Sequence, residues 1–229
     1  MAGIYRDLAP VHDTTMVPLT VLEPEGHARG GIVVLHESRE FTEPLLELMR
    51  SLADDGWTVL APDLFHRPAN GSTHPIFGDE LFAAFDACFE WLTGHGVFRD
   101  CIGVLGFDSA GTAAALVATN RPIGAAVSVA APGIETPLTP QAVALLAAAP
   151  AFQAPWLGLF GEDDPLTPPD QVDRLREAAA HADVATLVVT YPGLHHRPDH
   201  PGFDPAALDD VSVLDAQTRI YEWFDSHLR

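Results

Sequence analysis

The sequence contains no lysine, so arginine alone supplies its 12 basic side chains, against 32 acidic ones. The formal charge of −20 repels polyanions, which argues against nucleic acid and anionic lipid as partners. Long apolar runs are also missing. None approaches the roughly 20 residues of a membrane span, and none follows a basic start at the N-terminus. We therefore expect a soluble, cytoplasmic protein with neither a nucleic-acid nor a membrane partner.

Cysteine is scarce, with Cys88 and Cys101 alone in the chain. Two cysteines do not make a disulfide framework, and both fall in segments that are expected to be buried, so we predict two buried thiols. The sequence also has no internal repeat, no low-complexity tract and no linker long enough to separate domains. A length of 229 residues suits one domain, and we predict a single domain over 1–229.

Apolar runs that are typical of buried strands alternate with segments that have helical periodicity. Strands are predicted over 16–22 (an edge strand), 31–36, 57–63, 101–105, 123–130, 156–160 and 184–191. Helices are predicted over 43–54, 79–93, 112–119, 139–149, 169–181 and 205–228. This alternation predicts an α/β fold with a mostly parallel sheet of about seven or eight strands, covered by helices on both faces. Such sheets bind ligands at the carboxyl ends of their strands.

The segment Leu105-Gly106-Phe107-Asp108-Ser109-Ala110-Gly111 connects a predicted strand to a predicted helix. A sharp strand-to-helix turn of this kind is typical of the nucleophile elbow of α/β-hydrolases. The elbow needs small residues two before and two after its central residue, because the strand and helix backbones nearly touch there. Gly106 and Ala110 satisfy this requirement if Asp108 is central. Centring the turn on Ser109, the alternative, would place Phe107 where a small residue is needed.

Two further candidates follow later strands, in the chain order nucleophile, acid, histidine that α/β-hydrolases use. Asp164 follows the strand 156–160 and is the candidate acid, and His196 follows the strand 184–191 and is the candidate histidine. The acid would orient the imidazole, and the imidazole would move the proton. Two alternatives remain open: Asp164 as the cap of the helix that follows it, and His195 as the working histidine.

The chain resembles the dienelactone hydrolase family over nearly its full length. The matching segments are Val33–Glu37, Asp54–Leu64, the turn at Asp108, Gly161–Pro168 and Tyr191–His196. The resemblance implies an α/β-hydrolase fold and a hydrolase without cofactor or metal. It maps the family's nucleophilic cysteine onto Asp108, its acid onto Asp164 and its histidine onto His196. It also maps onto Glu37 a glutamate that interacts with the resting nucleophile. The arginines that hold a substrate carboxylate in the type member have no counterpart in 79–90, and His200 stands at the other matching place.

An aspartate at the elbow changes the expected chemistry. A carboxylate that attacks an ester yields a mixed anhydride, whereas attack on a saturated carbon yields an ester that His196 can hydrolyse through water. The predicted activity is hydrolysis of a small organic molecule, either an ester or lactone, or an epoxide or haloacid. The predicted binding residues are Glu37, Ser38, Arg39 and Ser109, with backbone amides as the oxyanion site.

Three alternatives remain open for the site as a whole. Asp108 is a general acid or base that shares a proton with Glu37, or the chain is an inactive homologue that binds a ligand or partner. In the third, His195, His196, Asp199 and His200 are metal ligands. We expect a monomer or a homodimer.

Overall fold

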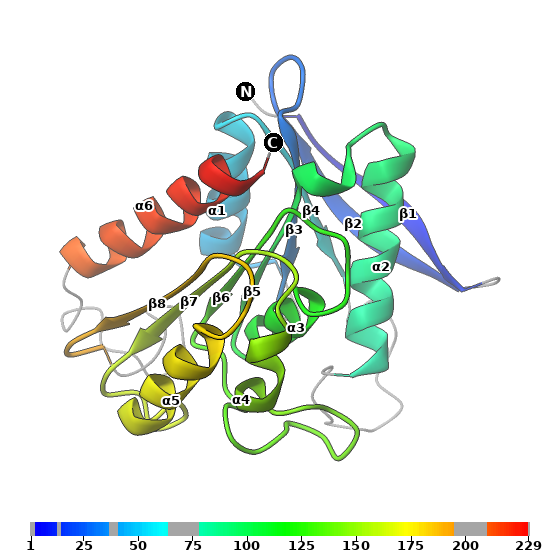
Figure 1. The fold of residues 1–229 in the computed structure, drawn as a ribbon. Helices are drawn as coiled ribbons and strands as arrows, with labels where there is room; N and C mark the ends of the chain where they lie inside the picture. The colour runs from blue at the N-terminus through cyan, green and yellow to red at the C-terminus, as the bar shows by residue number, and fades with distance from the viewer. Residues whose placement is uncertain (1–2, 13–14, 37–40, 64–77, 195–209, 229) are drawn as a thin grey trace.

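The computed structural model describes residues 3–12, 15–36, 41–63, 78–194 and 210–228. One eight-stranded sheet crosses the molecule, with the strand order β1-β2-β4-β3-β5-β6-β7-β8 (Figure 1). The pairs β1–β2 and β2–β4 are antiparallel, and all other neighbouring strands are parallel. The predicted fold class, a mostly parallel sheet of about seven or eight strands with helices on both faces, is confirmed.

The central strands form where the sequence is continuously apolar. β3 and β4 are buried at every residue, as expected for strands that are covered on both faces. The eight strands are β1 Gly3–His12, β2 Thr15–Glu23, β3 Gly30–Leu35, β4 Trp57–Pro62, β5 Ile102–Phe107, β6 Ala125–Val129, β7 Trp156–Gly161 and β8 Thr186–Tyr191.

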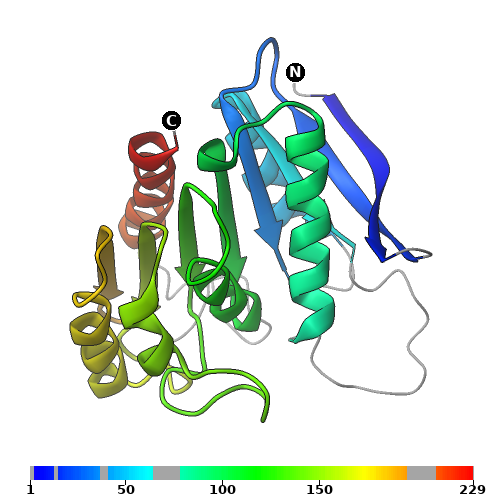
Figure 2. The same cartoon turned by 45° about the vertical axis from the view of Figure 1, so that its right-hand side comes forward.

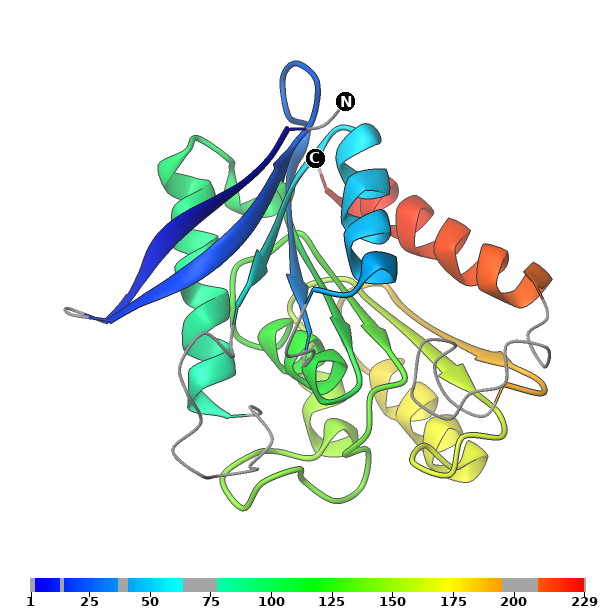
Figure 3. The same cartoon turned by 180° about the vertical axis from the view of Figure 1, so that it is seen from behind.

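Helices cover the two faces of the sheet unequally. α1 and α6 lie on one face and α2 to α5 on the other, as Figure 3 shows from behind. The α-helices are α1 Glu43–Asp54, α2 Asp79–Gly94, α3 Ser109–Val117, α4 Leu145–Ala148, α5 Pro169–Ala179 and α6 Asp210–His227. Short 3-10 helices cover Arg99–Cys101 and Ala149–Ala151. In the part of the chain that the structure describes, none of these helices combines the length and the apolar character that crossing a membrane requires.

The predicted bounds of α1 are confirmed at both ends. Its apolar side chains recur at helical spacing, and Leu45, Met49 and Leu52 are buried against the sheet. The chain leaves the helix through Gly56, whose φ of 101° lies in the region that favours glycine. β4 begins immediately afterwards, at Trp57.

Two predictions about secondary structure are wrong. The strand that was predicted over 16–22 is not at the edge, because the unpredicted strand β1 pairs with it from outside and forms the edge. The helix that was predicted over 139–149 is reduced to α4 and one 3-10 turn. The N–H groups of Leu145 and Leu146 donate to Gly133 and Ile134, in the preceding loop, so a helix cannot run through this segment.

Both cysteines are buried free thiols, as predicted. Cys88 lies in α2, and burial raises the pKa of its thiol. Cys101 closes the 3-10 helix one residue before β5, and burial is also the main cause that raises its pKa. Neither thiol lies at the carboxyl edge of the sheet.

The carboxyl ends of the parallel strands lie at one edge of the sheet, which is the lower edge in Figure 2. Asp108 follows β5 at this edge, and Asp164 follows β7. β6 lies between β5 and β7, so the usual strand spacing of about 4.8 Å places these two strand ends roughly 10 Å apart. The fold thus brings the candidate nucleophile and the candidate acid to the same edge.

Candidate active site

Asp108 occupies a sharp turn between β5 and α3. Its φ of 54° and ψ of −129° lie outside the regions that side-chain-bearing residues usually adopt. Its N–H donates to the carbonyl oxygen of Val129, on β6, over 3.0 Å. Its own carbonyl accepts from the N–H of Thr112 over 3.1 Å, which begins the hydrogen bonding of α3. The half-buried aspartate is therefore held by its backbone on both sides.

Gly106 shows why this turn needs a small residue two positions before Asp108. A Cβ atom at Gly106 would lie 2.1 Å from the carbonyl oxygen of Ala110, in the first turn of α3. A Cβ at Gly111 would also be close to backbone, at 3.1 Å from the carbonyl oxygens of Gly106 and Val129. The close approach of strand and helix that the sequence predicts is present.

Ala130 has a strained backbone next to that of Asp108. It follows β6, and its φ of 51° makes it the second non-glycine residue with positive φ in the described ranges, Asp108 being the first. Its N–H donates to Leu159 on β7 over 2.8 Å. Two strained residues at the ends of neighbouring strands are typical of a functional site, because the surrounding structure must hold them in place.

Buried polar contacts hold α3 against the end of β6. The Ser128 hydroxyl donates to the carbonyl oxygen of Gly111 over 2.7 Å and accepts from the Trp156 indole N–H over 2.9 Å. The Thr112 hydroxyl donates to the carbonyl oxygen of Pro132 over 2.6 Å. Every residue of α3 is buried, so the helix has little freedom to move away from the turn. Ser109, a predicted binding residue, is the first of these buried residues.

Asp164 is buried, with 2% of its surface exposed. One carboxylate oxygen accepts from the N–H of Leu166 over 2.8 Å, and the other from the hydroxyl of Thr167 over 3.1 Å. The alternative that Asp164 caps the following helix is wrong, because α5 begins five residues later and Pro168 occupies its cap position. The loop therefore holds the carboxylate in place through its own donors.

The loop that carries Asp164 is joined to the segment that precedes the two histidines. The N–H of Asp163 donates to the carbonyl oxygen of Leu194 over 3.1 Å, and the N–H of Glu162 donates to Tyr191 over 3.0 Å. Gly161 allows this contact, because a Cβ there would lie 2.2 Å from the Leu194 oxygen. Two separate strand ends thus act as one unit at this edge.

Several predicted site residues lie outside the described residues. Glu37, Ser38 and Arg39 follow His36 at the end of β3, and His195 and His196 follow Leu194. Asp199 and His200, which belong to the metal alternative, are also outside. Among the described residues there is no group of three or more histidine, cysteine or acidic side chains that could hold a metal ion.

A cavity of about 270 Å³ opens beside the turn at Asp108. His36, Phe107 and Ala130 line it at the carboxyl edge of the sheet, and α1 and α6 supply the walls farther away. Asp108 itself is not among the lining residues, although its neighbour in the chain, Phe107, is. No pattern in the sequence indicates this cavity, since its walls come from segments far apart in the chain.

His36 is the most notable residue of the cavity that sequence reasoning missed. It follows β3, only 3% of its surface is exposed, and its ring packs edge-on against Phe41 with 4.8 Å between ring centroids. β3 pairs with β5 so that Leu35 lies opposite Gly106, which places His36 about level with Phe107, one residue before Asp108. A histidine that ends an otherwise apolar run was the signal available in the sequence.

A polar network joins the end of β8 to α6 at the margin of this cavity. The Tyr191 hydroxyl donates to Asp215 over 2.9 Å, and the guanidinium of Arg219 donates to the same carboxylate over 2.6 and 3.3 Å. The bond from Arg219, followed by that from Tyr191, lowers the pKa of Asp215. Burial, followed by the hydrogen bond to Asp215, raises the pKa of Tyr191, so its hydroxyl remains a proton donor at neutral pH.

The strand order, the sharp turn at Asp108 and the parallel strands define an α/β-hydrolase fold. A crystal structure named "Putative Dienelactone Hydrolase", from Klebsiella pneumoniae subsp. pneumoniae MGH 78578, superimposes with a TM-score of 0.80 at 22% identity. The superposition covers 98% of this chain and 100% of the Klebsiella chain. Dienelactone hydrolase from Anabaena variabilis ATCC 29413 superimposes with a TM-score of 0.74 at 20% identity, over 100% of this chain and 99% of that one.

The sequence itself assigns the family. Residues 18–228 match the dienelactone hydrolase family, and the chain belongs to that family. A Yersinia pestis protein named "Putative carboxymethylenebutenolidase" is 23% identical over 231 residues, which cover 92% of this chain and 84% of that protein. The resemblance that the sequence motifs suggested is thereby confirmed at the level of the family.

Proposed function

We propose that this chain is a hydrolase of a small organic substrate, with Asp108 as nucleophile, His196 as general base and Asp164 as the acid that orients the histidine. The observation that carries the proposal is the strained backbone of Asp108 between β5 and α3. A positive φ at a residue other than glycine costs about 1–3 kcal/mol, and such residues gather at active sites. The strain falls on Asp108, whereas Ser109 is already helical, which favours the aspartate as the central residue of a nucleophile elbow.

The contacts of the acid loop support the partners of Asp108. Asp164 is held by Leu166 and Thr167, and the adjacent Asp163 is hydrogen-bonded to Leu194, two residues before His196. A short path through the backbone therefore connects the acid to the histidine. Asp164 is buried and fixed in place, and a carboxylate of this kind can orient the imidazole that accepts the proton.

The chemistry follows from the carboxylate. An oxygen of Asp108 attacks a saturated carbon, the bond from that carbon to its leaving group breaks with both electrons on the leaving group, and an aspartyl ester forms. His196 then removes a proton from water, and the hydroxide attacks the ester carbonyl. The bond from that carbon to the alcohol oxygen breaks as this oxygen takes a proton from the His196 imidazolium, and the Asp108 carboxyl loses its proton to solvent. A haloacid supplies such a carbon, and so does an epoxide, whose ring oxygen takes a proton from water as the ring opens. The N–H groups of the first turn of α3, next to Asp108, would stabilise the oxyanion of the second step.

Turnover in heavy-oxygen water tests the covalent role of Asp108. Water attacks the acyl carbon of the intermediate, so one carboxylate oxygen of Asp108 should become labelled, and mass spectrometry of its peptide should show the gain. His196→Ala should accumulate the alkylated Asp108 peptide, since the second step loses its base. A panel of esters, lactones, epoxides and haloacids identifies the substrate class for this measurement. An unlabelled Asp108 after many turnovers would instead favour the general acid or base alternative.

Variants of Asp108 separate an enzyme from a binding protein. Asp108→Ala should abolish turnover of epoxides and haloacids, and Asp108→Cys should gain ester or lactone hydrolysis, because a thiolate attacks carbonyl carbon well. Asp164→Asn should lower kcat strongly, while Asp163→Asn, at the exposed neighbouring position, serves as the matched control. Equal activity of the wild type and Asp108→Ala would contradict the proposal. Ligand binding without turnover by any variant would favour the inactive homologue.

A further inference from the structure

The cavity beside Asp108 is lined mainly by apolar side chains, and no arginine, aspartate or glutamate lines it among the described residues. Its polar lining residues are His36, Thr42, Tyr191, Ser212 and Gln217. Most of the side chains that α1 and α6 contribute are aliphatic: Leu45 and Leu48 on α1, and Val213, Ala216 and Ile220 on α6. A carboxylate placed between the two helices would lose its water without gaining an arginine partner among the described lining residues, which is unfavourable. The formal charge of −20 on the whole chain also disfavours an anionic ligand.

We propose that this cavity binds the uncharged, apolar part of the substrate, so the enzyme selects neutral molecules with an alkyl or aryl group, such as an epoxide, rather than anionic molecules such as a haloacid or a carboxylated lactone. The inference rests on the proposed function for the position of the reacting carbon. Phe107 and Ala130 line the end of the cavity next to Asp108, whereas Leu48 and Ile220 line it between the helices. The reacting carbon lies at the Phe107 end, and the apolar group extends between α1 and α6.

The volume sets the size of the group. An apolar cavity of about 150 Å³ holds benzene. The cavity here measures about 270 Å³, which corresponds to roughly two fused rings or an alkyl chain of about eight carbons. Each buried CH₂ group contributes about 0.8 kcal/mol, which is a factor of about four in affinity. Affinity should therefore rise with chain length until the cavity is full.

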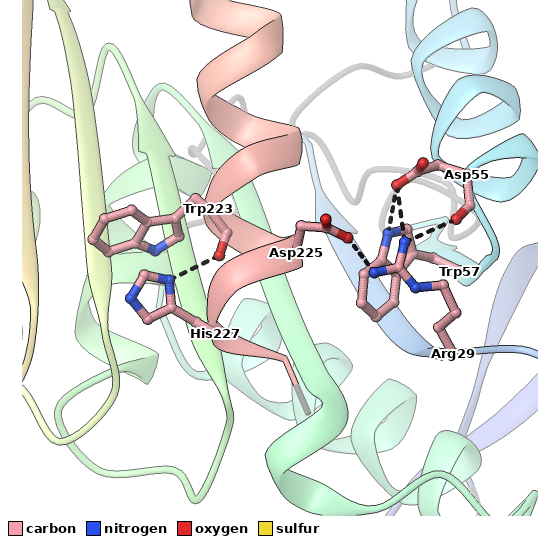
Figure 4. A network of polar contacts seen from close by, with 6 residues as sticks. All are labelled: Arg29, Asp55, Trp57, Trp223, Asp225 and His227. Carbon is pink, nitrogen blue, oxygen red and sulfur yellow. Dashed lines mark hydrogen bonds and ion pairs between the residues drawn. The ribbon is translucent and has the colours of Figure 1, made fainter.

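The walls are held by contacts at the far ends of both helices, so the cavity exists before a ligand arrives. Figure 4 shows Arg29 between Asp225 of α6 and Asp55, the residue that follows α1. The guanidinium of Arg29 also lies over the ring of Trp57, 4.5 Å from its centroid, and the Trp57 indole donates to Asp55 over 3.2 Å. Each exposed ion pair contributes little alone. Together with the ring contact, the ion pairs join the C-terminal ends of α1 and α6 beside the first residues of β3 and β4.

Calorimetry with n-alkyl alcohols from butanol to dodecanol, and with the matching carboxylates, tests the inference on the wild-type protein. These alcohols carry no bond for the enzyme to hydrolyse. We expect affinity to rise about fourfold per CH₂ and to level off near eight carbons, with each carboxylate at least tenfold weaker than its alcohol. Carboxylates that bind as tightly as the alcohols, or affinity that does not level off, would overturn it.

Neighbouring residues on α6 provide a matched pair of variants. Val213→Phe fills the cavity and should move the plateau to chains about two carbons shorter, while Leu214→Phe, on a side chain that is 65% exposed, should leave the series unchanged. Leu48→Ala enlarges the cavity from α1 and should move the plateau to longer chains, so the test survives if Val213→Phe does not fold. If affinity levels off at the same chain length in the wild type, Val213→Phe and Leu48→Ala, this cavity does not bind the apolar group and the proposal is wrong.

These binding measurements do not depend on the chemistry of Asp108. If Asp108 stays unlabelled but affinity still rises with the chain length of the alcohols, the covalent mechanism is contradicted and the ligand preference stands. If Asp108 is labelled but carboxylates bind better than alcohols, the covalent mechanism stands and the ligand preference is contradicted. The two proposals can therefore fail separately.

Discussion

The backbone N–H of Asp163 donates a hydrogen bond of 3.1 Å to the carbonyl oxygen of Leu194, which joins the loop after β7 to the loop after β8. Asp164 and the two candidate histidines lie one or two residues beyond this bond on either side. A main-chain contact transmits position better than a long side chain does, because it has fewer rotatable bonds. The contact thus links the loop of the proposed acid to Leu194, the last described residue before the two candidate histidines.

Gly161→Ala tests the importance of this contact. The new methyl group would lie 2.2 Å from the Leu194 oxygen, so the loops must separate. We expect a loss of activity of about 100-fold, since a displacement of about 1 Å can have that effect, with a loss of stability of about 1–3 kcal/mol. Gly94→Ala, where nothing lies within 4 Å, is the control and should retain activity. Full activity of Gly161→Ala would show that the contact does not position the site.

Gly106→Ala tests the turn at Asp108 itself. Its methyl group would lie 2.1 Å from the Ala110 oxygen, and main chain on both sides cannot give way easily. We expect the free energy of unfolding, measured by urea denaturation, to fall by about 1–3 kcal/mol, together with loss of activity. A variant as stable as the wild type would mean that strand and helix are not in close contact.

Ala130→Gly should stabilise the protein. Its φ of 51° strains alanine but suits glycine, so relief of strain should exceed the entropic cost of glycine, for a net gain of roughly 0.5–2 kcal/mol. Ala131→Gly is the matched control: it is fully buried and has an ordinary φ, so it should destabilise by about 1 kcal/mol. Urea denaturation of both variants measures the difference. Equal destabilisation by the two substitutions would contradict the strain at Ala130.

Asp215 should make stability depend on pH in the acid range. Its pKa in the folded protein lies below the ordinary 3.8, chiefly because Arg219 donates to it, so its contribution to stability is present above pH 3.8 and is lost as the pH falls through the lowered pKa. Asp215→Asn should therefore be less stable than the wild type at pH 7, and the two should converge below pH 3.8. Urea denaturation of both proteins between pH 7 and pH 3 measures the difference in their free energies of unfolding.

A control on the same helix separates this network from the general loss of one charge. Glu222→Gln removes a negative charge at an exposed position of α6 and should change stability at pH 7 by less than Asp215→Asn does. A gap between the wild type and Asp215→Asn that stays constant down to pH 3 would contradict the effect of Arg219 on the carboxylate.

Local features of the sequence were enough to predict the central strands and the turn at Asp108. β3 and β4 are continuously apolar because both of their faces are covered, and that pattern needs no knowledge of the partner strands. The spacing of Gly106 and Ala110 around Asp108 reflects a steric limit within five consecutive residues, so it too could be recognised locally. The burial of Cys88 followed from its place on an apolar helix face.

Segments that depend on distant partners were predicted less well. β1 was missed because most of its side chains are exposed and, among the described strands, it pairs with β2 alone, so it carries no continuous apolar run. The segment 139–149 has a helical composition, but the N–H groups of Leu145 and Leu146 bind carbonyls about twelve residues earlier. Tertiary hydrogen bonds overrode the local preference there.

The sequence by itself determined the fold class, the family and the order of the candidate residues along the chain, because these depend on patterns among near neighbours. Only the tertiary structure decided which walls enclose the cavity beside Asp108. Leu48 on α1 and Val213 on α6 both line it although most of the chain separates them. They line one cavity because both helices pack on the same face of the sheet, and no local pattern in either helix specifies the other as its neighbour.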